Sequence, residues 1–86
     1  MRTVTIYTKP LCPFCLRALS LLQGKRAEII EISAAFDREK REEMIARSGG
    51  RRTYPQIFIG DTHVGGYNDL AALDRDGKLD SLLDAA

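Results

Sequence analysis

The sequence predicts an α/β domain in which helices flank a mixed four-stranded sheet. Short segments rich in β-branched residues alternate with longer segments of helical period, and turn residues separate them. The predicted elements follow in the order β-α-β-α-β-β-α. The 86 residues fit one domain, and no linker, repeat or low-complexity segment divides them. We therefore expect residues 1–86 to fold as a single domain.

The first half of the chain predicts a β-α-β unit. Residues 3–8 alternate polar and apolar side chains and are rich in β-branched and aromatic types, as is typical of a strand. Pro13 suits the first turn of a helix, and the apolar spacing indicates a helix over residues 13–23 with Gly24 as its stop. The isoleucine-rich residues 27–32 predict a second strand. One helix between two strands with short links favours a right-handed parallel unit.

The middle of the chain predicts a second helix and a hairpin. Asp37 is placed to cap a helix that runs to about Ser48, where a glycine pair ends it. Residues 56–59 and 62–64 flank a Gly-Asp turn, which is typical of a β-hairpin. Together with the first two strands, this hairpin completes the mixed sheet.

A third helix is predicted after the hairpin. Asn68 or Asp69 can cap it, Leu70 and Leu73 lie at the spacing of an apolar face, and Gly77 would end it. A short amphipathic helix is expected at the end of the chain, where the apolar residues are Leu79, Leu82 and Leu83.

The composition is that of an ordinary globular protein without a bulk charge. Apolar residues make up 44% of the chain, which argues against disorder, and the net charge of +1 favours neither nucleic acid nor a membrane surface as a partner. The sequence shows no signal peptide and no run of about 20 apolar residues that could span a membrane. No apolar stripe calls for a dimer. We expect a cytoplasmic monomer that binds neither nucleic acid nor a membrane.

The motif that carries chemistry is Cys12-Pro13-Phe14-Cys15, which follows the first predicted strand and opens the first predicted helix. The free N–H groups and the positive dipole end at a helix N-terminus favour a thiolate. Cys12 lies where that field is strongest, whereas Cys15 lies inside the helix on its apolar side. We expect Cys12 to attack and Cys15 to resolve the mixed disulfide that forms. Lys9 adds positive potential beside them.

A metal site is the main competing interpretation of a Cys-x-x-Cys motif. Structural zinc normally takes four ligands, but the sequence has no further cysteine and only one histidine, His63. A closed zinc site within one chain is therefore not expected. The motif could also supply ligands to a site shared between two chains, or it could be a pair of incidental core cysteines. We expect His63 to be a surface or edge residue and not a catalytic base.

Three blocks of the sequence together resemble the glutaredoxin family, and in particular its small bacterial dithiol members. The similarity runs from Val4 to about Leu83, and the order and spacing of the blocks are specific. The blocks are Thr8-Lys9 followed by Cys12-Pro13-Phe14-Cys15, then Thr53-Tyr54-Pro55, and then Gly65-Gly66-Tyr67-Asn68-Asp69.

This resemblance implies a thioredoxin-like fold and a glutathione-dependent thiol–disulfide oxidoreductase. Such an enzyme reduces protein–glutathione mixed disulfides and protein disulfides, with glutathione as the reducing co-substrate and no tightly bound cofactor or metal. Its implied partners are glutathione and glutathionylated or disulfide-containing proteins. The resemblance also implies that Pro55 is cis and faces the two cysteines.

A glutathione site is implied in the same way. Gly66, Asn68 and Asp69 would hold the γ-glutamyl end, because N–H groups at a helix N-terminus bind a carboxylate and a carboxylate binds an ammonium group. Three positions depart from the family pattern. Tyr54 stands where valine is common, Phe14 where tyrosine is common, and Asn68 where an acid is common. The remaining implied contacts are Lys9 at the glycine carboxylate, the ring of Phe14, the backbone of Tyr54, and Thr53 and Pro55.

Two other functions compete with this one. In the first, the chain is an iron–sulfur carrier in which the Cys12 thiolates of two chains and two glutathiones hold the cluster; Pro13 disfavours it by stiffening the loop. In the second, the chain is a thioredoxin-like electron donor recharged by a reductase protein. The block from Gly66 to Asp69 disfavours the second, because it supplies the polar end of a glutathione site.

Overall fold

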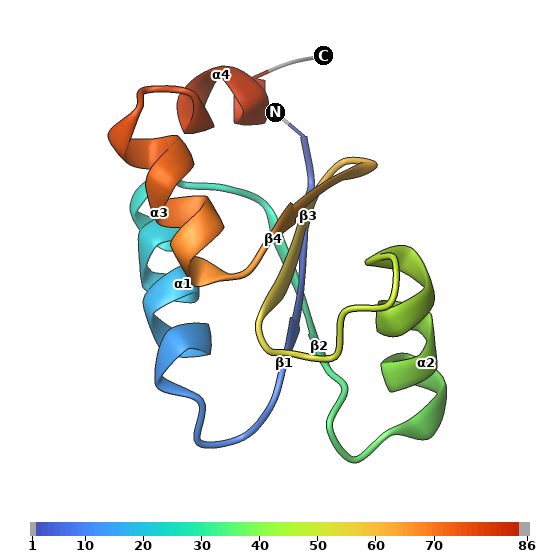
Figure 1. Ribbon diagram of the computed structural model, residues 1–86. Helices are drawn as coiled ribbons and strands as arrows, with labels where there is room; N and C mark the ends of the chain where they lie inside the picture. The colour runs from blue at the N-terminus through green and yellow to red at the C-terminus, as the bar shows by residue number, and fades with distance from the viewer. Residues whose placement is uncertain (1, 85–86) are drawn as a thin grey trace.

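The computed structural model describes residues 2–84 as four strands and four helices (Figure 1). Among these residues, no helix is long and apolar enough to cross a membrane. The elements are β1 (Val4–Thr8), α1 (Pro13–Gly24), β2 (Ile29–Ser33), α2 (Arg38–Arg47), β3 (Gln56–Ile59), β4 (Thr62–Gly65), α3 (Tyr67–Arg75) and α4 (Leu79–Asp84).

The four strands form one mixed sheet in the order β2-β1-β3-β4. β1 runs parallel to β2, in a register that pairs Val4 with Ile29 and Thr8 with Ser33. β3 runs antiparallel to both β1 and β4. The mixed four-stranded sheet and the parallel β1-α1-β2 unit are therefore as predicted. Because parallel strands end at the same edge of a sheet, the loops after β1 and β2 lie at one end of the molecule (Figure 1).

The alternation of side chains along the strands divides the core into two layers. Val4 and Ile6 of β1 join the larger cluster with Ala18 and Leu22 of α1, and with buried residues of β3, α3 and α4. Tyr7 points to the other face, where the smaller cluster lies under α2. Figure 1 shows the same arrangement, with α1 and α3 on one side of the sheet and α2 on the other.

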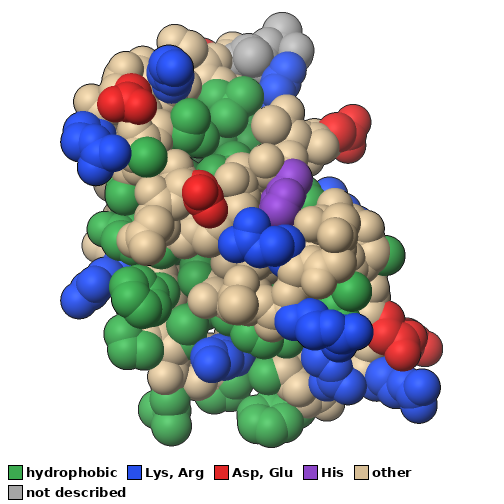
Figure 2. Space-filling model, in the orientation of Figure 1, with side chains coloured by type: hydrophobic (Ala, Val, Ile, Leu, Met, Phe, Trp, Pro, Cys, Tyr) green, Lys and Arg blue, Asp and Glu red, His purple; other side chains and the backbone are tan. Residues whose placement is uncertain are grey.

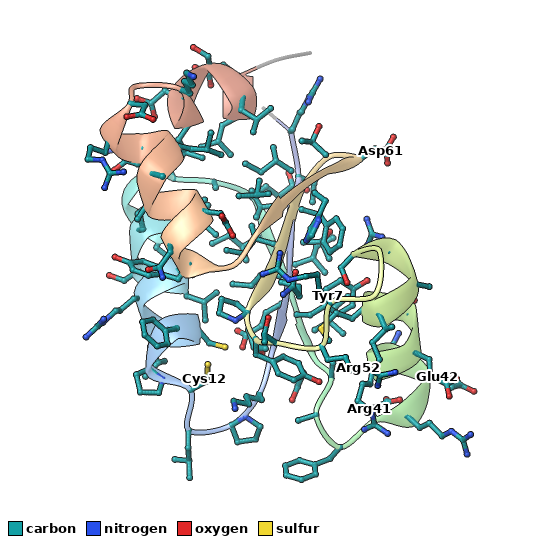
Figure 3. The ribbon with its side chains drawn as sticks, in the orientation of Figure 1. Tyr7, Cys12, Arg41, Glu42, Arg52 and Asp61 are labelled. Carbon is teal, nitrogen blue, oxygen red and sulfur yellow. The ribbon has the colours of Figure 1, made fainter. Side chains whose placement is uncertain are left out.

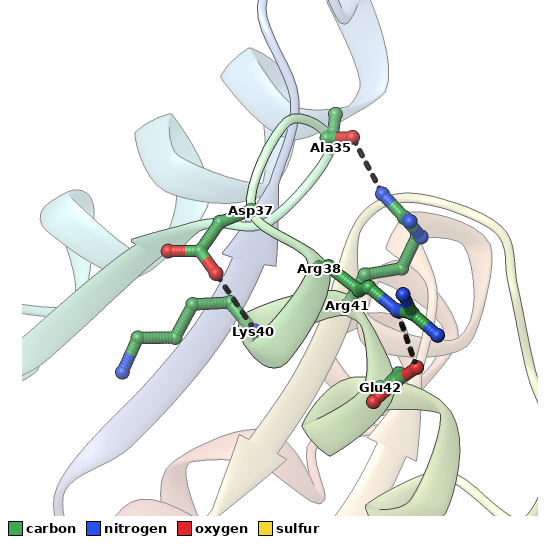
Figure 4. A network of polar contacts seen from close by, with 6 residues as sticks. All are labelled: Ala35, Asp37, Arg38, Lys40, Arg41 and Glu42. Carbon is green, nitrogen blue, oxygen red and sulfur yellow. Dashed lines mark hydrogen bonds and ion pairs between the residues drawn. The ribbon is translucent and has the colours of Figure 1, made fainter.

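The boundaries of α2 agree with the sequence, whereas those around the end of α1 differ slightly. The Asp37 carboxylate accepts a hydrogen bond from the Lys40 N–H at 3.2 Å and caps α2, as expected (Figure 4). Gly24, predicted as the stop of α1, is its last helical residue, and the left-handed turn falls on Arg26 with a φ of 58°. The strand expected over residues 27–32 begins and ends later for that reason, at Ile29–Ser33.

The prediction that Asn68 or Asp69 caps α3 is wrong. The N-cap is Gly66, whose carbonyl accepts the first helical hydrogen bond from the Leu70 N–H at 3.1 Å. Asp69 acts from inside the first turn instead, because its carboxylate accepts the Gly66 N–H at 2.9 Å. Gly65 makes the sharp turn from β4 into α3 possible with a φ of 117°, a conformation that residues with a Cβ rarely adopt.

We predict that Gly65→Ala lowers the free energy of unfolding by about 1–3 kcal/mol, the usual cost of a strained backbone conformation. A Cβ at Gly65 would also lie 2.9 Å from Cγ of Asp69 and press on the carboxylate that caps α3. Urea denaturation monitored by circular dichroism measures the change.

Gly24→Ala is the matched control for this prediction. Gly24 is helical, and a Cβ there would meet no atom within 4 Å. The substitution is expected to raise the free energy of unfolding by about 0.5–1 kcal/mol, because alanine loses less backbone entropy than glycine in a helix. Equal effects of the two substitutions would contradict the argument from backbone conformation.

Candidate active site

Cys12 lies at the boundary between the loop after β1 and the helix α1 (Figure 3). It is the N-cap residue of α1, its backbone is extended, and Pro13 is the first helical residue. The Cys15 N–H donates a hydrogen bond to Cys12 Sγ over 3.2 Å. An N–H group and the positive end of the helix dipole therefore both point at this sulfur.

Cys15 lies one turn further along α1 and points into the protein. Its side chain is 2% exposed, against 5% for Cys12, and both cysteines are free thiols. Burial, and after it the hydrogen-bonded Cys12, raises the pKa of the Cys15 thiol to about 12. Cys15 is therefore protonated at neutral pH.

A cis peptide bond joins Tyr54 to Pro55, immediately before β3. Pro55 is buried, and its carbonyl oxygen lies close to Gly66, where a Cβ would approach it to 3.6 Å. The loop before β3 and the N-terminus of α3 are thus in contact, although they are far apart in the sequence.

A cleft of about 170 Å³ opens between α1, this loop and the start of α3. All residues that the resemblance assigned to glutathione line it except Lys9, whose Nζ stands 5.9 Å from the centre of the Tyr54 ring instead. Sequence reasoning missed two lining residues, Arg51 and Tyr67. Their positions in the sequence could have indicated that they line the cleft, since Arg51 lies two residues before Thr53 and Tyr67 lies inside the third block. The predicted residues in the lining are Phe14, Thr53, Tyr54, Pro55, Gly66, Asn68 and Asp69.

The two walls of this cleft differ in chemistry. Phe14, half exposed, and Tyr67 form an aromatic wall, with ring centres 6.1 Å apart and planes tilted by 32°. The start of α3 also makes the cleft polar, because the first N–H groups of this helix have no partner within the helix. The exposed Asp69 places a carboxylate and the exposed Arg51 a guanidinium in the same cleft. Such a cleft suits a small zwitterionic ligand with a flat apolar portion.

Tyr54 also belongs to the packing on the α2 side of the sheet. Its ring packs against the smaller core cluster under α2, and its hydroxyl is buried without a hydrogen-bond partner among the described residues. Tyr7, in the same cluster and labelled in Figure 3, has hydrogen-bond partners for its hydroxyl. The hydroxyl donates to the Glu43 carboxylate and accepts from Arg47 Nη1 at 2.9 Å. Burial raises the pKa of Tyr7. Tyr54 thus lines the cleft and also packs against the smaller core cluster.

His63 lies on β4, which is an edge strand as expected for this residue. Its ring stacks on Phe58 at 4.8 Å, and its Nε2 lies 2.8 Å from Gln56 Oε1. Burial lowers the pKa of His63, so the neutral ring is favoured. Within residues 2–84, no three histidine, cysteine or acidic side chains are grouped closely enough to hold a metal ion.

Comparisons with known proteins identify one family. The Glutaredoxin family model matches residues 4–64. The chain is 53% identical to glutaredoxin 3 of Escherichia coli over 83 residues, which cover 96% of this chain and 99% of that protein. It is also 53% identical to a glutaredoxin of Pseudomonas aeruginosa over 85 residues, covering 99% and 100% of the two chains.

Solved structures show the same relationship. The solution structure of a Brucella melitensis glutaredoxin has a TM-score of 0.82 at 59% identity and covers 96% of this chain and 89% of its own. A buckwheat glutaredoxin–glutathione complex has a TM-score of 0.82 at 28% identity, with 93% and 74% covered. The fold is thioredoxin-like, and the site is that of a thiol–disulfide oxidoreductase. The chain belongs to the glutaredoxin family, whose members are glutathione-dependent oxidoreductases.

We predict that Tyr54→Phe raises the free energy of unfolding by about 1 kcal/mol, because it removes a buried hydroxyl that has no partner. Tyr7→Phe is the control and is expected to lower it by a similar amount, because it leaves Glu43 and Arg47 without their shared partner. Urea denaturation of both variants measures the difference. A loss of stability in Tyr54→Phe would contradict the prediction.

We also predict that iodoacetamide at about pH 8 alkylates Cys12 but not Cys15 in the native protein, since only a thiolate reacts. Cys15 keeps its proton because its pKa is about 12, and the side chain is buried. Mass spectrometry counts the labels, with Cys15→Ser as the variant that should still be labelled. Rapid native labelling of Cys12→Ser would show that Cys15 is ionised after all; unfolding that variant in urea should restore labelling.

Proposed function

We propose that this glutaredoxin reduces protein–glutathione mixed disulfides and protein disulfides, with Cys12 as nucleophile and Cys15 as resolving thiol. The observation that carries the proposal is the cleft beside the motif, whose lining comes from α1, the loop before β3 and the start of α3. Its aromatic wall and polar end match a small charged peptide such as glutathione.

Glutathione would lie in this cleft with its γ-glutamyl end at α3. The free N–H groups at the start of that helix would bind the carboxylate, with Asn68 beside them, and Asp69 would bind the ammonium group. The backbone of Tyr54 would pair with the central part of the peptide, next to Thr53 and Pro55. Lys9 and Arg51 are the cations available for the glycine carboxylate. The buckwheat glutaredoxin–glutathione complex supports this proposal.

For a glutathionylated protein, two exchange steps complete the reaction. The Cys12 thiolate attacks the glutathione sulfur, the protein thiolate leaves and takes a proton from water, and Cys12 is left bonded to glutathione. A second glutathione thiolate then attacks the glutathione sulfur of this adduct. Oxidised glutathione leaves and the Cys12 thiolate is restored. Cys15 takes no part in this route.

For a protein disulfide, Cys15 is required. Cys12 attacks one sulfur of the substrate and displaces the other, which takes a proton from water. Cys15 then loses its proton and attacks Cys12 Sγ, so that the reduced protein leaves and a Cys12–Cys15 disulfide forms. Two glutathiones reduce this disulfide. The high pKa of Cys15 keeps it from reacting before the mixed disulfide has formed.

The proposed setting is the cytoplasm, because the reaction consumes reduced glutathione and needs a pool that stays reduced. We propose that the chain acts as a monomer of one domain on glutathionylated or disulfide-containing proteins. Nucleic acid and membranes have no part in this function.

An iron–sulfur carrier is the second candidate, and one relative gives a reason to keep it. A solved structure 58% identical to this chain, with a TM-score of 0.74, is described as showing metal binding of glutaredoxins. In this chain the thiolates of Cys12 from two copies, together with two glutathiones, would be the ligands. Anaerobic reconstitution with iron and sulfide tests it. A brown dimer supports the carrier, and a colourless monomer excludes it.

We predict that Cys12→Ser abolishes the glutathione-dependent reduction of a glutathionylated peptide, because no other thiolate can attack. Cys15→Ser should retain this activity and lose the reduction of protein disulfides. The assay couples oxidised glutathione to glutathione reductase and NADPH. Turnover that survives in Cys12→Ser would refute the assignment of the nucleophile.

The wild type serves as the control that separates the competing functions. Turnover with glutathione supports the proposal directly. A wild type that turns over with a reductase protein and not with glutathione would instead identify a thioredoxin-like electron donor.

A further inference from the structure

Two large apolar side chains near the active site are almost fully exposed. Leu11 is 99% exposed and directly precedes Cys12, and Phe36, in the loop between β2 and α2, is 89% exposed. Figure 2 shows hydrophobic side chains at the lower edge of the molecule, the end at which Figure 1 places the loops after β1 and β2. Large apolar side chains exposed at one end of a molecule, next to its reactive group, are candidates for an interaction surface.

The sheet register brings the two residues to the same end of the fold. Thr8, the last residue of β1, pairs with Ser33, the last residue of β2, in a parallel arrangement. Leu11 follows the first of these and Phe36 the second, each by three residues. Neighbouring strands are about 4.8 Å apart, so both loops leave adjacent positions of one sheet edge. We call Leu11 and Phe36 together the apolar rim.

The backbone at Leu11 holds this side chain outward. Its φ is 55°, in the left-handed region that a bulky residue rarely adopts. No core contact compensates for this conformation, because the side chain is exposed. Such outliers gather at functional sites.

The loop of Phe36 is also fixed and does not hang free. The Ala34 N–H donates to the Thr8 carbonyl at 2.9 Å, which ties the loop to the end of β1. Arg41 Nη1 donates to the Ala35 carbonyl at 2.9 Å, as Figure 4 shows. Phe36 is therefore presented to solvent by a hydrogen-bonded loop, and a partner that covers it would have little loop entropy to overcome.

We propose that the apolar rim docks the polypeptide part of protein substrates, and that it favours apolar side chains next to the reacting cysteine. This inference rests on the proposed function. Neither rim residue lines the cleft that would hold glutathione. When glutathione fills that cleft, the polypeptide bonded to it has to lie over the surface around Cys12 outside the cleft, where the rim stands.

The covalent step identifies the occupant as a polypeptide. The Cys12 thiolate attacks the glutathione sulfur of the mixed disulfide, Cys12 becomes bonded to glutathione, and the polypeptide thiolate leaves and takes a proton from water. While the new bond forms, the residues beside the leaving cysteine are held against the end of the fold that carries the rim. Burial of their apolar side chains there would lower the free energy of this transition state.

The test uses two glutathionylated peptides that differ only beside the cysteine, with leucine and phenylalanine in one and serine and glycine in the other. We expect wild-type kcat/KM to be about tenfold higher for the apolar peptide, the effect of burying a small apolar area. Phe36→Ser and Leu11→Ser should each reduce this preference, and Phe36→Leu should keep most of it.

Ile30→Ser is the matched control, because Ile30 is 50% exposed and lies within β2, away from the rim. It should leave kcat/KM unchanged for both peptides. Equal kcat/KM for the two peptides would overturn the proposal that the apolar rim docks the polypeptide, while leaving the proposed function intact. Absence of any glutathione-dependent turnover would refute the proposed function itself.

The oligomeric state of the protein is the last measurement in this test. Sedimentation of the wild type and Phe36→Ser is expected to show the same monomer. A wild-type dimer that Phe36→Ser dissociates would show that a second copy of the chain covers the rim, and it would overturn the proposal.

Discussion

The hydrogen bond from the Cys15 N–H to Cys12 Sγ is the interaction around which this site is arranged. It exists because β1 ends at the sheet edge, the loop turns at once, and α1 begins with Pro13, which has no N–H to compete. The sulfur of Cys12 thereby takes the place that a serine or aspartate oxygen holds at an ordinary N-cap. The same helix buries Cys15 and keeps it protonated. One helix start thus places the two thiols in different environments.

The strand order bears on how glutathione and a polypeptide would share the surface around Cys12. β1 lies between β2 and β3, so different segments reach Cys12 from its two sides. On the β3 side, the loop with Pro55 and the start of α3 form the cleft. On the β2 side, the loop with Phe36 leaves the same edge of the sheet. A small peptide and a polypeptide chain could therefore occupy the site together, each on its own side.

The layer under α2 is stabilised differently from the main core. α2 is rich in charged residues, and Met44 is its one fully buried side chain. It is also held by polar contacts, since Tyr7 binds both Glu43 and Arg47, and the Arg47 guanidinium lies 4.3 Å from the centre of the Phe58 ring. Tyr54 packs into this layer with an unpaired hydroxyl. A polar layer of this kind fixes α2 in one orientation, and the loop that carries Phe36 is fixed with it.

Local patterns in the chain are enough to predict the elements of this fold and the pair of cysteines, because period, caps and turn residues act over a few neighbouring positions. These patterns predicted the cap at Asp37 and the hairpin over residues 56–64. The sequence-based prediction of the α3 cap was wrong, because the turn at Gly65 depends on how β4 meets that helix.

Which residues come into contact depends on the packing of the whole chain. The tertiary structure added Arg51 and Tyr67 to the cleft, placed Lys9 over Tyr54, and brought the loops of Leu11 and Phe36 to one end of the molecule. These placements follow from the order and register of the strands, which bring together segments far apart in the chain. No local pattern carries that information, because it is the packing of the whole sheet that selects one register.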